Sequence, residues 1–567
     1  METNPHPRRH ISKACEGCRQ QKIKCNGESP CKRCSRLSLT CVVREVTRQR
    51  QQRDDASDAI MQTALRPVRI RNEMTGSGAP RTAVYGPTST VAVLYLISSR
   101  KSGYTALPEA ANVTNSSLSL ETFNYHLFTL GITPGSSLPL GPAVLTPPLC
   151  LTTIPKQLLE FFLNRYINTA WGTVPIQSPA QLTSLLQSSC SAFSRNAQPP
   201  TFYPVLLYQL AMGSLLTRHE EFSEMLVMES SLFVSTAGGL TEEMKLQLVY
   251  YSEVGNFDKA YEILGYAQGI ICTAGYHLDP QAQTPGVKRL LQTLLSLDTL
   301  VYVCIAVGRP SLLTPTICLS SNDIDINCPV SKFVSGLFDI INNTLRAQQH
   351  PDMSFERLWE SAWTTHNKLV SFWAENQPAL QFAHADSGAP RGVAGEMGLH
   401  VILHQYAILT NFRPFLLYLG YRSIVGEKDD NISPRSKASQ ELELEPSAGA
   451  TSVSQRNNDS KETETRLSAI SDYIYTSALT IISTLSEIRR NGSLLKDLPM
   501  NSYFLETACI SLICHGLWHG TQSAVQIWDA LDKGLQCMEA LQHQKVTLMR
   551  LAAVRSAIEQ SGLQRLG

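Results

Sequence analysis

Six cysteines near the start of the chain are its most chemically informative residues. They are arranged as Cys15-x2-Cys18-x6-Cys25 and, after five further residues, as Cys31-x2-Cys34-x6-Cys41. Dense cysteines that include two x2 pairs are typical of zinc sites with thiolate ligands. No apolar stretch of a secretory signal precedes them, so we expect a reducing compartment, which disfavours disulfide bonds. The pattern therefore predicts a metal centre.

The number of cysteines constrains how metal could be bound. Two separate tetrahedral zinc sites need eight ligand positions, and six thiolates supply them only if two sulfurs each bridge both ions. Because the spacing repeats, the bridging cysteines are expected at equivalent places in the two halves. Such a cluster carries a net negative charge, which nearby cations would offset. A single site built from the two x2 pairs is an alternative, but it leaves Cys25 and Cys41 without a role.

The charge of the chain is unevenly distributed. Residues 1–53 contain 13 Lys or Arg and 4 Asp or Glu, whereas the remaining residues contain 36 and 44. A small basic segment joined to a mildly acidic body indicates a module that binds a polyanion.

The segment from Cys15 to Cys41 resembles the binuclear zinc-cluster DNA-binding domain of fungal transcription regulators, because all six cysteine spacings match. The resemblance implies two Zn²⁺ ions per domain, bridged by Cys15 and Cys31. It also implies that the short helix in "RQQKIKC" lies in the major groove of double-stranded DNA and reads CGG-type triplets. Lys22 would then donate to the guanine edge, a common direct contact.

The residues expected to contact DNA are Arg19, Gln21, Lys22, Lys24, Arg33 and Arg36. The cations other than Lys22 are assigned to phosphates, which give affinity without sequence information, although some could only neutralise the cluster. Gln21 stands where family members commonly have a basic residue, which leaves room for an altered triplet preference. The equivalent stretch of the second half, "SRLSLT", contains Leu37 and Leu39, so we expect it to pack rather than to read DNA.

The region after the cysteines does not predict a strong coiled coil. Apolar residues fill only four of the seven seam positions between Val43 and Ala64, and Pro67 ends any helix there. We therefore assign residues 1–48 to the zinc-cluster domain and residues 49–150 to a basic extension and a flexible linker rich in Thr, Ser, Gly and Pro. A homodimer, if one forms, is expected to use the large domain.

From Ile154 onward the apolar residues follow a helical period. "PKQLLEFFLNRYINTAW" places Leu159, Phe162 and Tyr166 on one face, and Ser178 with Gln181 predicts a capping box. Since strand alternation is almost absent, we predict an all-α fold: a helical regulatory domain over 151–426 with C-terminal helices over 467–567. Residues 427–466 are expected to be a disordered acidic insertion.

Three stretches are similar to the middle homology domain that accompanies the zinc cluster in fungal transcription factors: "AYEILGYAQGIICTAGYHLDP", "LLSLDTLVYVCIAVGRPSLL" with "NDIDINCP", and "ILTNFRPFLLY". The resemblance implies a regulatory, ligand-sensing body without catalytic residues. Asp298, Arg309 and Asp325 in these stretches are interpreted as buried or capping groups rather than as a site.

No motif of an enzyme stands out, so we expect a non-enzymatic protein. The pairs His400/His404 and His515/His519 have the i, i+4 spacing of metal ligands, but they lie among apolar residues and lack the HExxH glutamate. We predict a nuclear, zinc-dependent DNA-binding transcription regulator, with transcription machinery or co-regulators as partners and no membrane segment. A co-regulator that no longer reads DNA and a helical enzyme with an accessory zinc module are the alternatives.

Overall fold

The computed structural model divides the chain into two compact units, Met1–Ala59 and Ile60–Gly567. The residues that the structure describes are 15, 18, 21, 23–26, 30–37, 41, 49–72, 81–101, 112–114, 118–129, 150–170, 177–195, 200, 202–232, 241–278, 284–298, 309, 311–313, 329–348, 353–385, 393–430, 450–519, 524–541 and 544–563.

The N-terminal unit contains the short helix α2 (Lys32–Arg36) within the second cysteine repeat. Its N-cap is Cys31, whose sulfur accepts a hydrogen bond from the Cys34 backbone N–H at 3.4 Å. Ser, Thr or Asp usually fills this position, so the cysteine combines a capping role with its place in the cluster. The helix α3 (Gln49–Ala64) begins in this unit and ends before Pro67, as proline requires.

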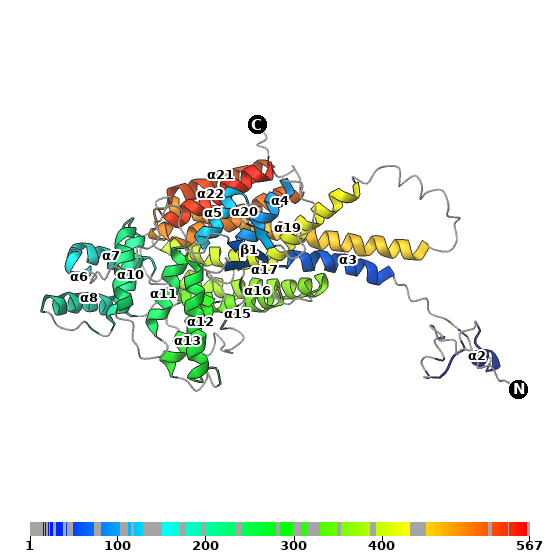
Figure 1. The fold of residues 1–567 in the computed structure, drawn as a ribbon, viewed down its shortest axis with the longest axis horizontal. Helices are drawn as coiled ribbons and strands as arrows, with labels where there is room; N and C mark the ends of the chain where they lie inside the picture. The colour runs from blue at the N-terminus through cyan, green and yellow to red at the C-terminus, as the bar shows by residue number, and fades with distance from the viewer. Residues whose placement is uncertain are drawn as a thin grey trace. The chain divides into compact units, whose positions relative to one another are not determined.

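The larger unit is helical (Figure 1), which confirms the predicted all-α class. One group of helices is arranged around α9, which packs against α7, α8, α10 and α11, and α11 in turn packs on α12 and α13. Their bounds are α7 (Lys156–Asn168), α8 (Pro179–Ser194), α9 (Tyr203–Leu215), α10 (Glu220–Leu232), α11 (Glu242–Glu253), α12 (Phe257–Thr273) and α13 (Pro285–Ser296), and the short α6 (Cys150–Thr153) precedes them.

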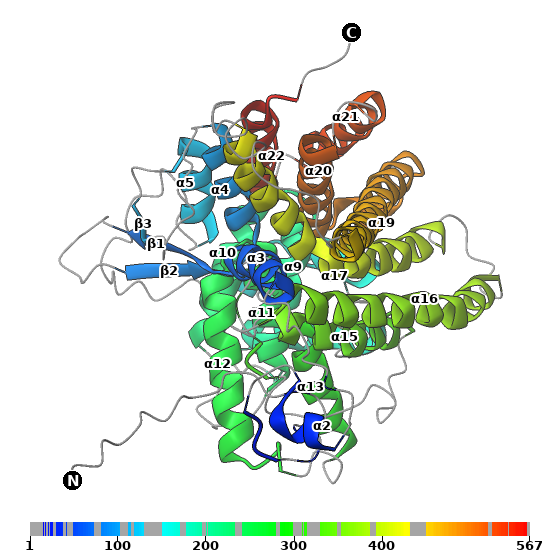
Figure 2. The same cartoon turned by 90° about the vertical axis from the view of Figure 1, so that its right-hand side faces the viewer.

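A second group forms a curved layer in which each helix packs on the next along the chain (Figures 1 and 2). Its members are α15 (Pro329–Gln348), α16 (Phe355–Ala385), α17 (Val393–Asp430), α19 (Ala450–Arg490), the 3₁₀ helix η5 (Leu494–Asp497), α20 (Met500–His519), α21 (Ala524–Ala540) and α22 (Lys545–Ser561). A contact between α13 and α15 joins the two groups into one body with a continuous core.

The periodic positions of these helices face the core as the sequence predicts. In α7, Leu159, Phe162 and Tyr166 are buried, and α8 begins with the predicted capping box of Ser178 and Gln181. A Cβ atom on Gly213 would lie 2.0 Å from the Phe162 carbonyl oxygen, so α7 and α9 meet backbone to backbone at this glycine.

The segment that we expected to be a flexible linker differs from that expectation in its described part. It contains α4 (Thr90–Lys101) and α5 (Leu120–Thr129), both packed on α22, and a three-stranded sheet in the order β2-β1-β3. The strands β1 (Val68–Asn72) and β2 (Arg81–Tyr85) are antiparallel, with Val68 opposite Tyr85, and β3 (Asn112–Thr114) runs parallel to β1.

The linker prediction failed because strands of three to five residues leave a weak pattern among Thr, Ser, Gly and Pro. Ile70 and Tyr85 are nevertheless completely buried in the core of the body. The Tyr85 hydroxyl lies 2.6 Å from both His126 Nδ1 and Thr129 Oγ1 of α5, which ties the sheet to the helices. The linker residues 130–149 lie outside the described part.

The predicted disordered insertion over 427–466 is helical at both ends in the described residues. The helix α17 continues to Asp430 and α19 begins at Ala450, while residues 431–449 lie outside the described part. Arg466 links the start of the buried part of α19 to α16. It pairs with Glu356 of α16 at 2.8 Å and with Glu462, one turn earlier in α19, at 2.7 Å.

The stretches similar to the middle homology domain adopt capping structures and helices. The Asp298 carboxylate accepts hydrogen bonds from the backbone N–H groups of Leu312 and Leu313, at 3.2 and 2.7 Å. Asp298 is thus buried and bonded to backbone N–H groups, in keeping with the predicted buried or capping role, whereas Arg309 forms an ion pair with Asp258 that was not predicted. Asp325 lies outside the described residues.

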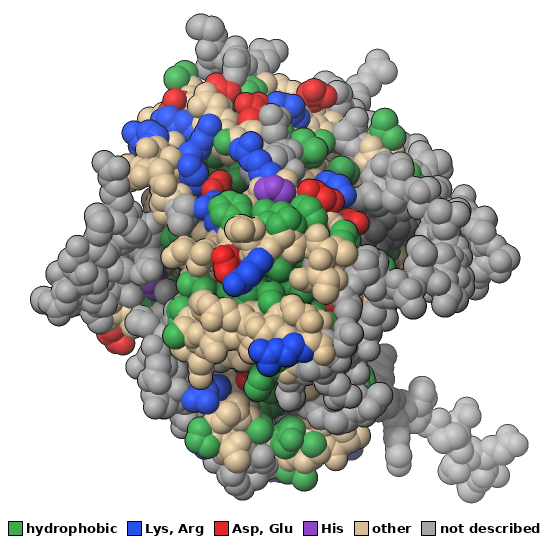
Figure 3. Space-filling model, turned by 90° about the vertical axis from the view of Figure 1, so that its left-hand side faces the viewer, with side chains coloured by type: hydrophobic (Ala, Val, Ile, Leu, Met, Phe, Trp, Pro, Cys, Tyr) green, Lys and Arg blue, Asp and Glu red, His purple; other side chains and the backbone are tan. Residues whose placement is uncertain are grey.

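The face of the body drawn in Figure 3 is mixed in character: hydrophobic side chains are interspersed across it, and Lys and Arg side chains gather at its upper left. Within the described ranges, no helix has the length and hydrophobicity required to cross a membrane.

Candidate metal centre

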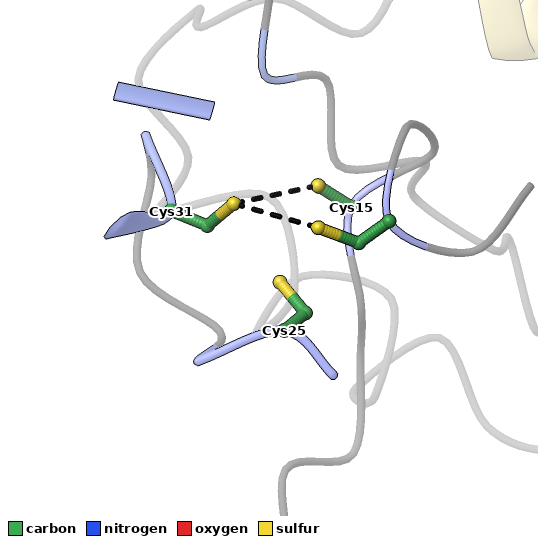
Figure 4. Close-up of side chains that lie close together, drawn as sticks. Cys15, Cys25 and Cys31 are labelled. Atoms are coloured by element: carbon green, nitrogen blue, oxygen red, sulfur yellow. Dashed lines mark hydrogen bonds between the residues drawn. The ribbon is translucent and has the colours of Figure 1, made fainter. Parts of the chain in front are cut away.

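The structure brings all six cysteines of the N-terminal repeat together. Five of them are buried and Cys41 is half-buried, and none forms a disulfide. The sulfurs of Cys15 and Cys31 are 3.7 Å apart, and the same distance separates Cys15 from Cys34 and Cys18 from Cys31. Figure 4 shows the sulfurs of Cys15, Cys25 and Cys31 directed toward a common point.

The sulfur positions fit zinc. Two sulfurs bound at about 2.3 Å to one tetrahedral ion lie about 3.8 Å apart, whereas a disulfide requires about 2.05 Å. The observed spacing of 3.7 Å therefore matches thiolates around a shared ion and excludes bonded sulfurs.

The cysteines form two sets of four, each with its sulfurs within 4.8 Å of one another. One set is Cys15, Cys18, Cys25 and Cys31, and the other is Cys15, Cys31, Cys34 and Cys41. The sets share Cys15 and Cys31, the first cysteines of the two repeats. Two tetrahedral ions with two bridging thiolates require this sharing, and a single four-cysteine site from the two x2 pairs does not use Cys25 or Cys41.

Backbone hydrogen bonds favour the thiolate at the two shared cysteines. A bond from the Cys34 N–H lowers the pKa of Cys31 to about 6, and a bond from the Cys18 N–H is the main cause of the lowered pKa of Cys15. The pKa of Cys18 is raised to about 11, chiefly by its hydrogen bond with Cys15. The sulfurs best placed to bridge are thus the ones most readily deprotonated.

Two local contacts hold the repeats together. Asn26 Oδ1, after the first repeat, accepts a hydrogen bond from the Lys32 N–H at 3.1 Å, and the Cys41 sulfur accepts one from the Cys31 N–H at 3.2 Å. The sequence reasoning did not single out Asn26. Its position between Cys25 and a Gly-containing loop is the only signal that could have indicated it, because Asn often bonds nearby backbone groups.

The residues predicted to contact DNA fall into three cases. Lys24 and Arg36 are exposed and free to meet a phosphate, while Arg19 and Lys22 lie outside the described residues. Gln21 and Arg33 are instead bonded to each other, since Arg33 Nη2 donates to Gln21 Oε1 at 2.6 Å. Arg33 also opposes the rise in the pKa of Cys18, which supports the alternative that this cation neutralises the cluster.

The expectation that the second half only packs does not hold at Leu37. This side chain is 47% exposed at the end of α2, and Lys32 and Arg36 of the same helix are exposed as well. The five-residue helix α2 buries only Cys34, so the second half also presents cations to solvent. Leu39 lies outside the described residues.

His400, His404 and His515 belong to no cluster of potential metal ligands among the described residues. Within the described residues, the only sets of three or more potential ligands near one another are the two cysteine sets. His404 Nε2 lies 3.0 Å from the Leu369 carbonyl oxygen, and His400 packs edge-on against Phe333. His515 Nδ1 lies 2.8 Å from Ser471 Oγ, and the His519 side chain lies outside the described part. The prediction that these are core histidines is consistent with these contacts.

Residues 13–50 match the fungal Zn(2)-Cys(6) binuclear cluster domain. No solved structure matches the chain. Because the family match does not extend to the helical body, the similarity of the body to the middle homology domain stays a prediction.

Curated relatives match short parts of the chain. The chain is 53% identical over 38 residues to the thiamine repressible genes regulatory protein thi1 of Schizosaccharomyces pombe, which is 7% of this chain and 5% of that protein. It is 37% identical over 84 residues to the xylanolytic transcriptional activator xlnR of Neosartorya fischeri. This match covers 14% of this chain and 8% of that protein. The chain is also 46% identical over 50 residues to xlnR of Emericella nidulans, which is 9% of this chain and 5% of that protein. The matched stretches thus span less than a tenth of these relatives.

Proposed function

We propose that this chain is a zinc-dependent, sequence-specific DNA-binding regulator of transcription that acts in the nucleus and is not an enzyme. The observation that carries the proposal is the pair of four-cysteine sets that share Cys15 and Cys31. The match of residues 13–50 to the fungal cluster domain, and relatives named as regulators of transcription, support it.

Two zinc ions per chain would be held by Cys15, Cys18, Cys25, Cys31, Cys34 and Cys41. Zinc supplies cross-links between the repeats that the small unit cannot obtain from an apolar core. The cysteines fix the loops, and the Cys31 sulfur together with Asn26 sets the start of α2. Lys24, Lys32 and Arg36 then present exposed cations from both halves to the phosphates of double-stranded DNA.

Base reading is assigned to Lys22, which would donate to the guanine of a CGG-type triplet. Because Gln21 and Arg33 bond each other, they are proposed to position this surface or to meet the backbone rather than to read a base. The helical body would regulate activity, recruit transcription machinery or co-regulators and provide any homodimer contact. By its resemblance to fungal regulators, the protein is proposed to control a metabolic or secondary-metabolite gene set.

Zinc stoichiometry tests the metal centre. The purified full-length chain should contain two zinc ions, and Cys25→Ser should remove at least one of them. A chain that holds one ion both before and after this substitution would instead fit the single site of the two x2 pairs.

Selection from random duplexes tests the DNA reading. The full-length protein should enrich a CGG-type triplet, and Lys22→Ala should weaken binding to the selected site by about 1–3 kcal/mol. Lys24→Ala is the matched control and should weaken selected and random DNA alike. If no triplet is enriched, the chain is better described as a co-regulator whose cluster no longer reads DNA, an outcome that the Gln21–Arg33 bond would explain.

A further inference from the structure

The helical body contains a basic pocket that the DNA-binding role does not use. It lies where the turn after α9 meets α19, η5, α20 and α21, and its volume is about 240 Å³. The polar part of its lining consists of Arg218, Arg489, Lys496, Asp497 and Asn501. Five elements therefore contribute to one small concave site.

The pocket carries an excess of positive charge. Its single carboxylate, that of Asp497, is already paired with Arg165 of α7. Among the described residues, Arg218 and Lys496 have no carboxylate partner, and Arg489 donates to the Gln536 carbonyl oxygen at 2.5 Å and also interacts with Cys537, which is not a carboxylate. Three cations around one concave site repel one another, and an anion placed between them would relieve that repulsion.

The surroundings of the cations are ordered before any ligand binds. Arg218 has a φ of 65°, the only positive φ at a non-glycine residue in the described chain, and this costs backbone energy. The turn is held by a hydrogen bond from the His219 N–H to the Ser214 carbonyl oxygen at 3.1 Å. Asn501 is fixed by a bond from its Nδ2 to the Leu495 carbonyl oxygen at 2.7 Å.

The remaining lining residues are apolar: Leu485, Leu505, Cys537, Ala540 and Leu541. A site lined by both charged groups and hydrocarbon suits a small organic acid better than a free inorganic ion. The volume lies below the range of about 300–1,000 Å³ that is usual for drug-sized ligands, so the occupant must be small.

We propose that this pocket binds a small organic anion with carboxylate or phosphate groups, held by Arg218, Arg489 and Lys496 and packed on the apolar lining residues. Such a ligand links α9, α19, α20 and α21, so its binding stabilises the helical body. The site goes beyond DNA reading and gives the body a candidate effector.

Thermal unfolding of the full-length, zinc-loaded protein tests the site without DNA, so its outcome is independent of the DNA-binding proposal. Succinate and inorganic phosphate are the probes, and sodium chloride at equal ionic strength is the reference. At least one probe should raise the Tm of the body in a saturable way, because a ligand that binds only the folded state stabilises it. The probe that does so distinguishes a carboxylate from a phosphate ligand, and the absence of any rise above sodium chloride would overturn the proposal.

Substitutions locate the effect. Lys496→Met should weaken binding of the effective probe about tenfold or more, since one charged hydrogen bond is lost. Lys533→Met is the matched control, because Lys533 is an exposed cation on α21 that pairs with Asp529 outside the pocket. Equal affinities in the two variants would overturn the proposal. If Lys496→Met lacks the helical far-UV spectrum, Arg218→Asn replaces it, because Asn tolerates a positive φ.

Discussion

The cysteine unit and the helical body are stabilised by different physical means. In the described part of the N-terminal unit, every buried hydrophobic residue is a cysteine of the cluster. The body instead has a continuous aliphatic and aromatic core that includes Phe162, Tyr208 and Phe415. One unit therefore depends on a bound metal and the other on the exclusion of water, so a change can be designed to damage either one alone.

The largest expected effect is the loss of a shared cysteine. Cys31→Ser removes a sulfur that belongs to both four-cysteine sets and also the cap of α2, so zinc content should fall toward zero and DNA binding should be abolished. Metal analysis and a gel-shift assay measure these losses, while the far-UV spectrum of the body should be retained.

The matched substitution in the body is Cys514→Ser, at a fully buried cysteine of α20. It should leave two zinc ions bound and lower the free energy of unfolding of the body by about 1–3 kcal/mol, because a hydroxyl is buried in an apolar site. A zinc loss in this variant would show that the two units are not independent.

The next largest effect is expected at the buried ion pair of the body. Arg550 Nε lies 3.3 Å from Glu506 Oε2, and both side chains are almost completely buried. Arg550→Met should destabilise the body by about 3–5 kcal/mol, since it leaves the Glu506 carboxylate buried without its partner. Chemical denaturation measures the loss, with unchanged zinc content.

Arg555→Met on the same helix is the control for this experiment. Arg555 pairs with Glu539 in solvent, so its loss should cost less than about 1 kcal/mol. Similar costs for the two variants would contradict the role assigned to the buried pair.

A smaller effect is expected from pH on the body. Burial lowers the pKa of His126 to about 4, below the usual value of about 6.5 for an unfolded chain. Because the unfolded chain takes up a proton that the folded body does not, stability should fall as the pH decreases from about 6.5 toward 4. His366 and His404, whose pKa values burial also lowers, should add to this trend.

Urea midpoints of the body at pH 7.5 and 5.5 measure the dependence. The difference between the two midpoints should be smaller in His126→Gln than in the unchanged protein. An equal difference in both proteins would mean that His126 is protonated in the folded body.

The smallest effects are expected at exposed cations of the cysteine unit. Lys24→Ala and Arg36→Ala should each reduce the slope of log affinity against log salt by about 1 on random DNA, with little change in zinc content. Lys533→Ala in the body is the control and should leave the slope unchanged. A change of the same size in the control would assign DNA contact to the body as well.

The sequence predicted the cluster well because its determinants are local. Six cysteines within one short segment define the ligand sets without any distant contact, and the helical period of α7 likewise needs only its own residues. It could not predict the bond between Gln21 and Arg33, because that depends on how the two repeats fold against each other. The exposure of Leu37 could not be predicted for the same reason, because it depends on how the two repeats fold against each other.

Long-range arrangements account for the other differences. The strand β1 is recognisable only once β2 and β3 lie beside it, and Val113 of β3, which pairs with Ile70 of β1, lies 43 residues further along the chain (113 − 70). The basic pocket combines Arg218 with Lys496 from distant helices, so no single window of the sequence contains its pattern. Such features follow from the packing of the whole body rather than from any one segment.

The contact of α4 and α5 with α22 has a consequence for how the protein is made. Roughly 400 residues separate these helices, so on a ribosome that adds about 5–20 residues per second the early pair would wait about 20–80 seconds for its partner. The cysteine unit needs no such partner and can take up zinc as soon as it emerges. The DNA-binding end would therefore mature during synthesis, while the body would close only after α22 is released, leaving the apolar faces of α4 and α5 in need of chaperones until then.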